Sequence, residues 1–174
     1  MEYRMMELKE AERIREIDAT YFIKNAWREI DGELCLVEIN WTDYELPNGL
    51  QWHLSHFSNS ISSGGCVYGC FDNGLLVGYG AVDGDLFGTA SKYLLLDQLF
   101  VSKDYRNKHI GRTILSLCAD WARAKGADKL YICAGSSEDT VAFYRKMGCV
   151  NATEINEELY QNDTRDLQLE LCLI

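Results

Sequence analysis

Hydrophobic and polar residues along this chain follow two recurring patterns, one typical of strands and one typical of helices. Two pairs of strand-like runs each flank a tight turn: 22–30 and 33–40 around Asp31-Gly32, and 66–71 and 75–82 around Asp72-Asn73-Gly74. Aspartate or asparagine followed by glycine tolerates the positive φ angles that short hairpin turns require. The pattern therefore predicts two β-hairpins, with a loop over 41–49 and a helix over 50–61 between them.

Apolar residues at helical spacing predict further helices. One amphipathic helix is expected over residues 7–18 and a longer one over 110–125. A third helix begins at Ser136 or Ser137, because either hydroxyl can cap it, and Gly148 ends it.

The remaining strand-like segments are 2–6, 93–101, 129–134, 149–153 and 166–174, and the stretch 154–165 is a polar loop. Residues 93–101 are nearly continuously apolar, as expected of a central strand that is buried on both faces. Asp97 and Gln98 interrupt this run, and local conflicts of this kind gather at functional sites. The order of elements predicts an α/β fold, with one mixed sheet, helices on its faces and a single domain over residues 1–174.

Composition and charge narrow the function. The 174 residues are 47% hydrophobic and 25% charged, which is ordinary for a globular protein. Residues 1–90 contain 15 acidic and 6 basic side chains, a charge of −9, whereas residues 91–174 contain 12 and 11, a charge of −1. An acidic chain disfavours a nucleic-acid partner. Its field favours a cationic small molecule, unless the charge serves only solubility.

The compartment is also constrained. No apolar run approaches the roughly 20 residues of a membrane span, and the N-terminus lacks a signal-peptide core. We therefore expect a cytoplasmic protein without a membrane partner. The 7 cysteines are scattered and form no Cys-x-x-Cys pair, so we expect reduced thiols and no metal site.

The loop between residues 102 and 112 gathers positive charge in this acidic chain. Lys103, Arg106, Lys108 and Arg112 lie where a strand ends and the helix at Ile110 begins. Unpaired amides at a helix N-terminus bind phosphate well, and the helix dipole assists them. The loop is a candidate phosphate site, with an ordinary solvated basic turn as the alternative.

Most of the chain, and residues 93–149 most clearly, resembles the GNAT N-acetyltransferase family. The family's acetyl-CoA motif is Arg/Gln-x-x-Gly-x-Gly/Ala, and this chain has Arg106-Asn107-Lys108-His109-Ile110-Gly111, with His109 in place of the first glycine. The segments LFVSKDYR (99–106) and AFYRKMGC (142–149) also resemble family segments. The resemblance implies a mostly antiparallel, twisted sheet with splayed central parallel strands and flanking helices.

The resemblance further implies acetyl-CoA as the acyl donor. Its pyrophosphate would lie on the amides between Arg106 and Arg112, and its pantetheine along the exposed backbone where the central strands splay. The cofactor-binding residues so implied are Leu99, Phe100, Val101, Arg106, Asn107, Lys108, His109, Ile110, Gly111, Arg112 and Ser137. Glycine at this position lets the backbone approach phosphate closely, so His109 is expected either to adopt a permissive backbone conformation or to donate a hydrogen bond itself.

Two residues are candidates for proton transfer. Tyr144 matches the family tyrosine that protonates the departing CoA thiolate, and a phenol can supply that proton. A packing role is the alternative for Tyr144. Asp97 lies where many relatives carry a glutamate and is the first candidate base, with a purely structural carboxylate as the alternative. Glu170 is a weaker candidate base.

The acidic N-terminal half is where a second substrate is expected. Aromatic rings mixed with carboxylates suit an ammonium ion, although core aromatics with surface acids explain them equally well: Trp41, Asp43, Tyr44, Glu45 and Trp52. His53 and His56 lie three residues apart on a predicted helix. Because no third metal ligand is evident, we expect both to face a substrate cleft or solvent.

Together these features predict an acetyl-CoA-dependent N-acetyltransferase that acts by direct transfer on a small cationic amine, such as an antibiotic or a polyamine. The hairpin over 22–40 resembles the layout of streptothricin acetyltransferases. The alternatives are acetylation of a protein or peptide amine, and a non-catalytic acyl-CoA-binding module that kept the fold. The oligomeric state stays open, with a homodimer as one option.

Overall fold

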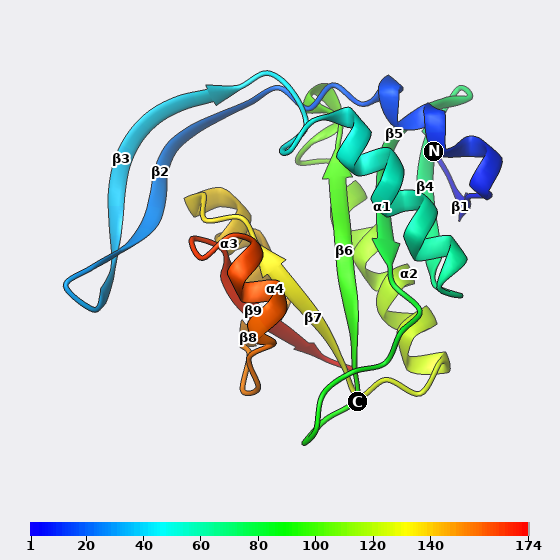
Figure 1. The fold of residues 1–174 in the computed structure, drawn as a ribbon. Coiled ribbons are helices and arrows are strands. Elements are labelled where there is room, and N and C mark those ends of the chain that lie inside the picture. The colour runs from blue at the N-terminus through cyan, green and yellow to red at the C-terminus, as the bar shows by residue number, and fades with distance from the viewer. Residues whose placement is uncertain (174) are drawn as a thin grey trace.

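The computed structural model describes residues 1–173, which form a seven-stranded sheet, a separate two-stranded hairpin and helices on both sheet faces (Figure 1). The strands are β1 (Glu2–Met5), β2 (Tyr21–Ile30), β3 (Glu33–Asp43), β4 (Cys66–Asp72), β5 (Leu75–Val82), β6 (Tyr93–Val101), β7 (Lys129–Ala134), β8 (Val150–Asn151) and β9 (Leu167–Cys172). The helices are α1 (Leu50–Ser62), α2 (Ile110–Ala124), α3 (Glu138–Lys146), α4 (Glu157–Asn162) and two 3₁₀ helices, η1 (Leu8–Glu16) and η2 (Lys103–Tyr105).

The sheet has the strand order β1-β4-β5-β6-β7-β9-β8. Strands β6 and β7 pair in parallel over Tyr93–Leu95 and Lys129–Tyr131, whereas the other neighbouring pairs are antiparallel. Beyond this short contact β6 and β7 diverge, and Figure 1 shows them close together at one end and spread apart at the other. The expected mostly antiparallel sheet with splayed parallel strands at its centre is confirmed.

Both predicted hairpin turns are present, with the expected dihedral angles. Asp31 and Gly32 have φ angles of 52° and 81°, and Asn73 and Gly74 have φ angles of 49° and 82°. Two consecutive positive φ angles produce a backbone twist that matches the twist of the flanking strands. The turn residues therefore fix the register of β2 with β3 and of β4 with β5.

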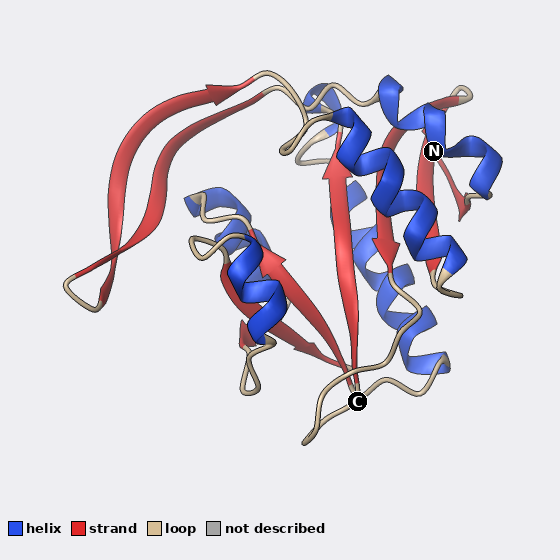
Figure 2. Cartoon of the chain, viewed as in Figure 1, coloured by secondary structure: helices blue, strands red, loops and turns tan. Residues whose placement is uncertain are grey.

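Two hydrophobic cores cover the two faces of the sheet. On one face α2 and α3 pack over the strands, and Leu94, Leu130 and Ile114 are fully buried there. On the other face α1 and η1 pack over β4 and β5, where Phe57 and Tyr79 are fully buried. Removing one such side chain from water stabilises the fold by about 1.5–3 kcal/mol. Figure 2 shows the helices on either side of the strands.

The structure corrects two of the predicted elements. The helix expected over 7–18 is a 3₁₀ helix, in which Arg13 pairs with Glu16 at 2.9 Å across three residues. Such i,i+3 pairs suit a 3₁₀ helix, because its side chains eclipse every third residue. The loop expected over 154–165 contains α4, whose first turn is capped by the Asn156 side chain. The last strand is confirmed over Leu167–Cys172, and residue 174 of the predicted range lies outside the described residues.

The β2–β3 hairpin arches away from the sheet on the side where α3 lies (Figure 1). Its middle is tied to the start of α3, because the Trp27 amide donates to the Ser136 carbonyl at 2.7 Å and Asn25 Nδ2 donates to Glu138 at 2.7 Å. A hollow of about 380 Å³ remains between the hairpin and α3. None of the helices within residues 1–173 is long and apolar enough to cross a membrane.

Candidate active site

The loop that follows β6 is held in place by the segment before the hairpin. Ser102 Oγ accepts from the Asp18 amide at 2.8 Å, and the Lys103 amide donates to the Asp18 carbonyl at 2.8 Å. The Arg106 guanidinium donates to the carbonyls of Ala19, Thr20 and Val101 at 3.2, 2.8 and 3.0 Å. The Arg106 side chain is thus a clamp inside the protein, and a role in binding the cofactor stays a prediction for it.

Past this clamp the backbone presents a series of free amides. The amides of residues 107–112 have no acceptor within residues 1–173, and the first bond of α2 runs from the Thr113 amide to the His109 carbonyl at 3.0 Å. Asn107 and His109 have φ angles of 61° and 62°. Left-handed residues among helical ones turn successive amides toward one point and form an anion-binding concavity. We call residues 107–112 the amide loop.

The dihedral angle at His109 explains the glycine of the motif. A φ of 62° places this residue in the left-handed region, which glycine adopts without a steric penalty and other residues adopt at a cost of about 1–2 kcal/mol. The chain keeps this conformation with a histidine, which confirms the first of the two expectations for this position. Gly111 follows in the first turn of α2, where a Cβ atom would lie 3.5 Å from the Phe143 ring.

The contact between Gly111 and Phe143 brings the start of α2 to α3, which carries the predicted acid. Tyr144 is 8% exposed and belongs to the core between α2, α3 and the sheet. Burial raises the pKa of Tyr144, so its phenol stays protonated across the neutral range. Burial in the core also fits a packing role, and proton donation by Tyr144 stays a prediction.

The divergence of β6 from β7 leaves one edge of β6 free. Residues 96–101 have no strand partner on the side of β7 among the described residues. The Ser102 amide donates to the Val77 carbonyl on β5. Because backbone groups alternate in direction along a strand, the amide and carbonyl groups of Leu99 and Val101 point away from β5, toward the gap. The Val101 carbonyl already accepts from Arg106 Nε at 3.0 Å. The edge at Leu99 thus remains free for an extended ligand.

A β-bulge interrupts β6 beside this gap. Ala81 pairs with Gln98 and Val82 pairs with Leu96, so Asp97 is the extra residue. A bulge re-aims side chains, and here both polar residues point toward α1. Asp97 Oδ2 lies 2.9 Å from His56 Nδ1, and Gln98 Nε2 donates to the His53 carbonyl at 3.2 Å. The polar residues that interrupt the apolar run of this strand therefore mark a bulge, and the extra residue of the bulge carries a carboxylate.

The environment of Asp97 shifts its protonation. Its side chain is 9% exposed, and burial together with the nearby Asp83 carboxylate raises the pKa of Asp97 to about 6, while His56 opposes the shift. Burial also raises the pKa of Asp83, which accepts from Ser60 Oγ at 2.6 Å. Above pH 6 the ionised Asp97 accepts a hydrogen bond from His56.

The two histidines of α1 have different surroundings. His53 is 1% exposed, and its two nitrogens contact the Tyr79 hydroxyl at 2.9 Å and the Pro47 carbonyl at 2.8 Å. The expectation that both histidines face a cleft or solvent is wrong for His53, whose ring is a core element. His56 is 34% exposed and stacks on Trp52, with ring centroids 3.5 Å apart.

Other candidate residues have structural partners. Glu170 accepts from the Tyr93 hydroxyl and from Lys129 Nζ, both at 2.7 Å, so its carboxylate is already paired. Ser137 caps α3 by accepting from the Thr140 amide at 3.3 Å. Whether Ser137 also contacts a cofactor stays a prediction. Trp41 and Tyr44 are 61% and 76% exposed, so these two rings are not core aromatics. Whether they line a cleft with Trp52 stays a prediction.

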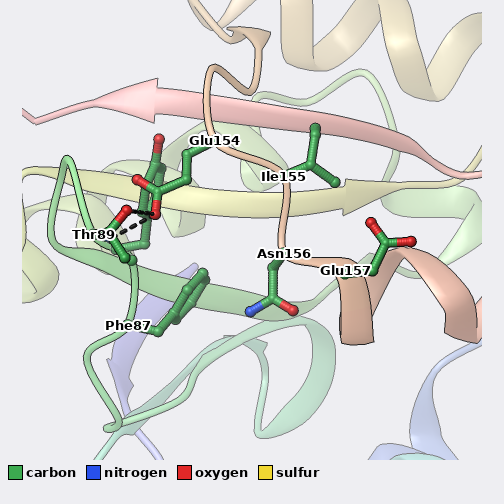
Figure 3. A pocket seen from close by; sticks show the side chains of 8 residues that line it. Phe87, Thr89, Glu154, Ile155, Asn156 and Glu157 are labelled. Carbon is green, nitrogen blue, oxygen red and sulfur yellow. Dashed lines mark hydrogen bonds between the residues drawn. The ribbon is translucent and has the colours of Figure 1, made fainter.

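A second hollow, of about 300 Å³, lies beside α4 (Figure 3). Glu154 reaches across it, accepting from Thr89 Oγ1 at 2.8 Å and from the Ala90 amide at 3.0 Å. This carboxylate therefore joins the loop before β6 to the loop before α4. Within residues 1–173 no group of three potential ligands is arranged to hold a metal ion.

Comparison with known proteins places this site in a family. The Acetyltransferase (GNAT) family matches residues 11–149, which is most of the chain. A search of curated proteins found no match. The chain belongs to the Acetyltransferase (GNAT) family, is an acetyltransferase and uses acetyl-CoA as its acyl donor.

Solved structures share the fold at low identity. A nourseothricin acetyltransferase is 19% identical, with a TM-score of 0.75 over 99% of this chain and 98% of the other. A protein assigned as a streptothricin acetyltransferase, from Bacillus anthracis str. Ames and in complex with acetyl coenzyme A, is 13% identical, with a TM-score of 0.71 over 98% of each chain. A ribosomal-protein alanine N-acetyltransferase from Escherichia coli is 15% identical, with a TM-score of 0.63 over 99% of this chain and 93% of the other.

Proposed function

We propose that this acetyltransferase transfers the acetyl group of acetyl-CoA directly to an amine of a small polycationic compound, in the cytoplasm. The observation that carries the proposal is the gap between β6 and β7. On the side of α2 lie free amides, and on the side of α1 lie the carboxylates Asp97 and Asp83. The free amides donate hydrogen bonds and suit the phosphates of acetyl-CoA, whereas the carboxylates accept hydrogen bonds and suit a cationic amine.

The proposed cofactor contacts use backbone more than side chains. The amide loop binds the pyrophosphate, and its own Lys108 and Arg112 side chains add positive charge. The edge of β6 at Leu99 pairs with the pantetheine amides as an additional strand would. In this arrangement the pantetheine runs along β6 from Val101 toward Asp97, a stretch of four residues that spans roughly 13 Å. The thioester at its end then lies in the gap near Asp97.

Direct transfer is favoured over a cysteine acyl intermediate. Burial raises the pKa of the Cys66 and Cys133 thiols to about 12 and that of Cys149 to about 11. A thiol is nucleophilic as its thiolate, and these three form little thiolate at neutral pH. The amine therefore attacks the thioester carbonyl itself, and Tyr144 protonates the departing sulfur.

The chemistry of the acceptor is inferred from charge. Residues 1–90, which supply α1 and the hairpin, carry a charge of −9. Two nearby structures are named for acetylation of nourseothricin and streptothricin. These observations support a small amine with several positive charges over a peptide.

A thiol-release assay tests the proposal. The protein is incubated with acetyl-CoA and, separately, with streptothricin, kanamycin, spermidine and a peptide with an N-terminal alanine, and free CoA thiol is measured. We expect at least one of the three cationic small molecules to accelerate release at least tenfold over the peptide. Acceleration by the peptide alone would overturn the proposed substrate class, and binding of acetyl-CoA without acceleration by any amine would overturn the proposed reaction.

A further inference from the structure

We propose that His56 is the residue that takes the proton from the acceptor amine, and that Asp97 is a positioning residue that acts through it. This inference rests on the proposed acetylation of an amine and names the base of that reaction. Sequence reasoning gave the role of base to Asp97 and did not assign one to His56.

The hydrogen bond between the two residues fixes the form of the ring. A carboxylate only accepts hydrogen bonds, so at 2.9 Å the Nδ1 atom of His56 carries the hydrogen and donates it to Asp97 Oδ2. The lone pair then lies on Nε2, which has no hydrogen-bond partner within residues 1–173. Asp97 is 9% exposed and His56 is 34% exposed, so of the two residues His56 is the one that a substrate can reach.

The ring of His56 is also held in one plane. Trp52 lies one helical turn earlier in α1, and the two rings stack with an interplanar angle of 19°. With Asp97 on one edge and Trp52 on one face, the ring loses little freedom when a substrate binds. A base held in orientation by a carboxylate is also found in catalytic triads, where the carboxylate orients the base that activates the nucleophile.

His53 supplies an internal comparison on the same helix. Both of its nitrogens are in contact with Tyr79 or Pro47, and burial lowers the pKa of His53. It therefore has no nitrogen to offer a substrate. The charged and titratable groups around His56 are Asp97 from β6, Asp83 after β5 and His53 from α1. Two of these are carboxylates, which attract an ammonium ion.

Two protons leave the acceptor nitrogen during the reaction. The substrate ammonium gives its first proton to His56 Nε2, which passes it to bulk water, and the neutral nitrogen forms a bond with the acetyl carbon. The carbon–sulfur bond breaks, its electron pair goes to sulfur, and the Tyr144 hydroxyl protonates that sulfur. The second proton leaves the nitrogen as the amide forms and restores the hydroxyl of Tyr144 through solvent. The products are the acetylated amine and CoA thiol.

The test compares variants across pH, with whichever of streptothricin, kanamycin and spermidine is turned over fastest. We expect His56→Gln to lower kcat by about 10²- to 10³-fold at pH 7, which lies within the range typical of a lost general base. The difference in kcat between His56→Gln and the unchanged protein should shrink toward high pH, where the amine loses its proton without a base from the protein. Ser55→Ala, on the exposed side of α1, should leave kcat within twofold of the unchanged protein.

Asp97 is tested through its dependence on His56. We expect Asp97→Asn to lower kcat less than His56→Gln does, and the double variant to be no slower than His56→Gln alone. If His56→Gln keeps both kcat and the pH profile while Asp97→Asn loses activity, Asp97 is the base and the inference fails. If no amine is turned over by the unchanged protein, the proposed function fails instead.

A measurement on the unchanged protein covers the case in which the variants fold poorly. The ¹⁵N NMR shifts of the His56 ring at pH 8 should show a protonated Nδ1 and an unprotonated Nε2. Added imidazole should also restore part of the activity of His56→Ala. A ring with its hydrogen on Nε2 would contradict the inference.

Discussion

The two sides of the gap between β6 and β7 present different polar groups to it, backbone donors on one side and side-chain acceptors on the other. In the amide loop the donors are backbone amides, aimed by positive φ angles at Asn107 and His109. At the contact between α1 and β6 the acceptors are side chains, aimed by the bulge at Asp97 and by a hydrogen bond to His56. The first kind of site depends on dihedral angles and tolerates a change of side chain, whereas the second kind depends on side-chain identity.

This difference explains how the chain departs from its family motif. Histidine replaces glycine at position 109, and the backbone still has the left-handed conformation that the amide loop requires. No comparable substitution is tolerable at the carboxylate side, since removing the Asp97 carboxylate removes the group that fixes the His56 tautomer. We therefore expect large effects from single side-chain changes near the chemistry and smaller ones in the amide loop.

The largest effect is expected for Tyr144→Phe, which deletes one hydroxyl and little packing volume. Without a proton donor for the sulfur, kcat should fall by about 10²- to 10⁴-fold. The dissociation constant for CoA, measured by calorimetry, should stay within about threefold, because the amide loop is unchanged. A variant that turns over at the original rate would remove Tyr144 from the mechanism.

A pair of variants at His109 tests whether the amide loop acts through its backbone. Proline fixes φ near −65° and cannot adopt the observed 62°, so His109→Pro should weaken CoA binding at least tenfold. His109→Gly permits the same angle and should leave the dissociation constant within about threefold. The comparison is broken if His109→Gly loses binding as strongly as His109→Pro, because the side chain would then be the ligand.

Arg106→Met tests the clamp. It removes three hydrogen bonds from a charged donor to the carbonyls of Ala19, Thr20 and Val101. We expect the free energy of unfolding to fall by more than about 1.5–3 kcal/mol, the contribution of one such bond. CoA affinity should change less than stability, as measured by urea denaturation and calorimetry on the same samples. A strong loss of CoA affinity at unchanged stability would show instead that the guanidinium binds phosphate directly.

The smallest expected effect is a dependence of stability on pH that belongs to Asp97. Its folded pKa of about 6 lies above the ordinary aspartate value, so the folded state binds more protons than the unfolded state between about pH 4 and 6. This group therefore makes the protein more stable as pH falls through that window. Asp97→Asn removes this contribution of Asp97 to the pH dependence of stability.

The measurement compares urea unfolding of the two proteins at pH 5, 6 and 8. Asp97→Asn should have its greatest stability relative to the unchanged protein at pH 8, and the difference should shrink toward pH 5. Carboxylates that do not interact with Asp97 contribute equally in both proteins and cancel; one is Glu10, whose pKa the Arg4 guanidinium lowers to about 2. A difference that grows toward low pH would mean that Asp97 is stabilised as the anion.

The elements of this protein could largely be predicted from its sequence, because their signals are local. The turns at Asp31-Gly32 and Asn73-Gly74, the apolar run of β6 and the stripe of α2 each lie within a single segment. The motif at 106–111 likewise identified the family before the fold was known. The 3₁₀ form of η1 and the helix α4 were missed, since i,i+3 pairing and a cap on a short polar segment are weaker signals.

The arrangement of the site depended on contacts between distant residues. His56 and Asp97 are 41 residues apart, and nothing in the sequence indicates that the bulge at Asp97 turns this side chain toward α1. The same holds for Arg106, whose partners Ala19 and Thr20 lie 87 and 86 residues away. The sequence by itself determined the elements, the family and the candidate residues, because each depends on local order. Only the tertiary structure decided which side chains are paired and which remain free, because hydrogen bonds and burial depend on distances between elements.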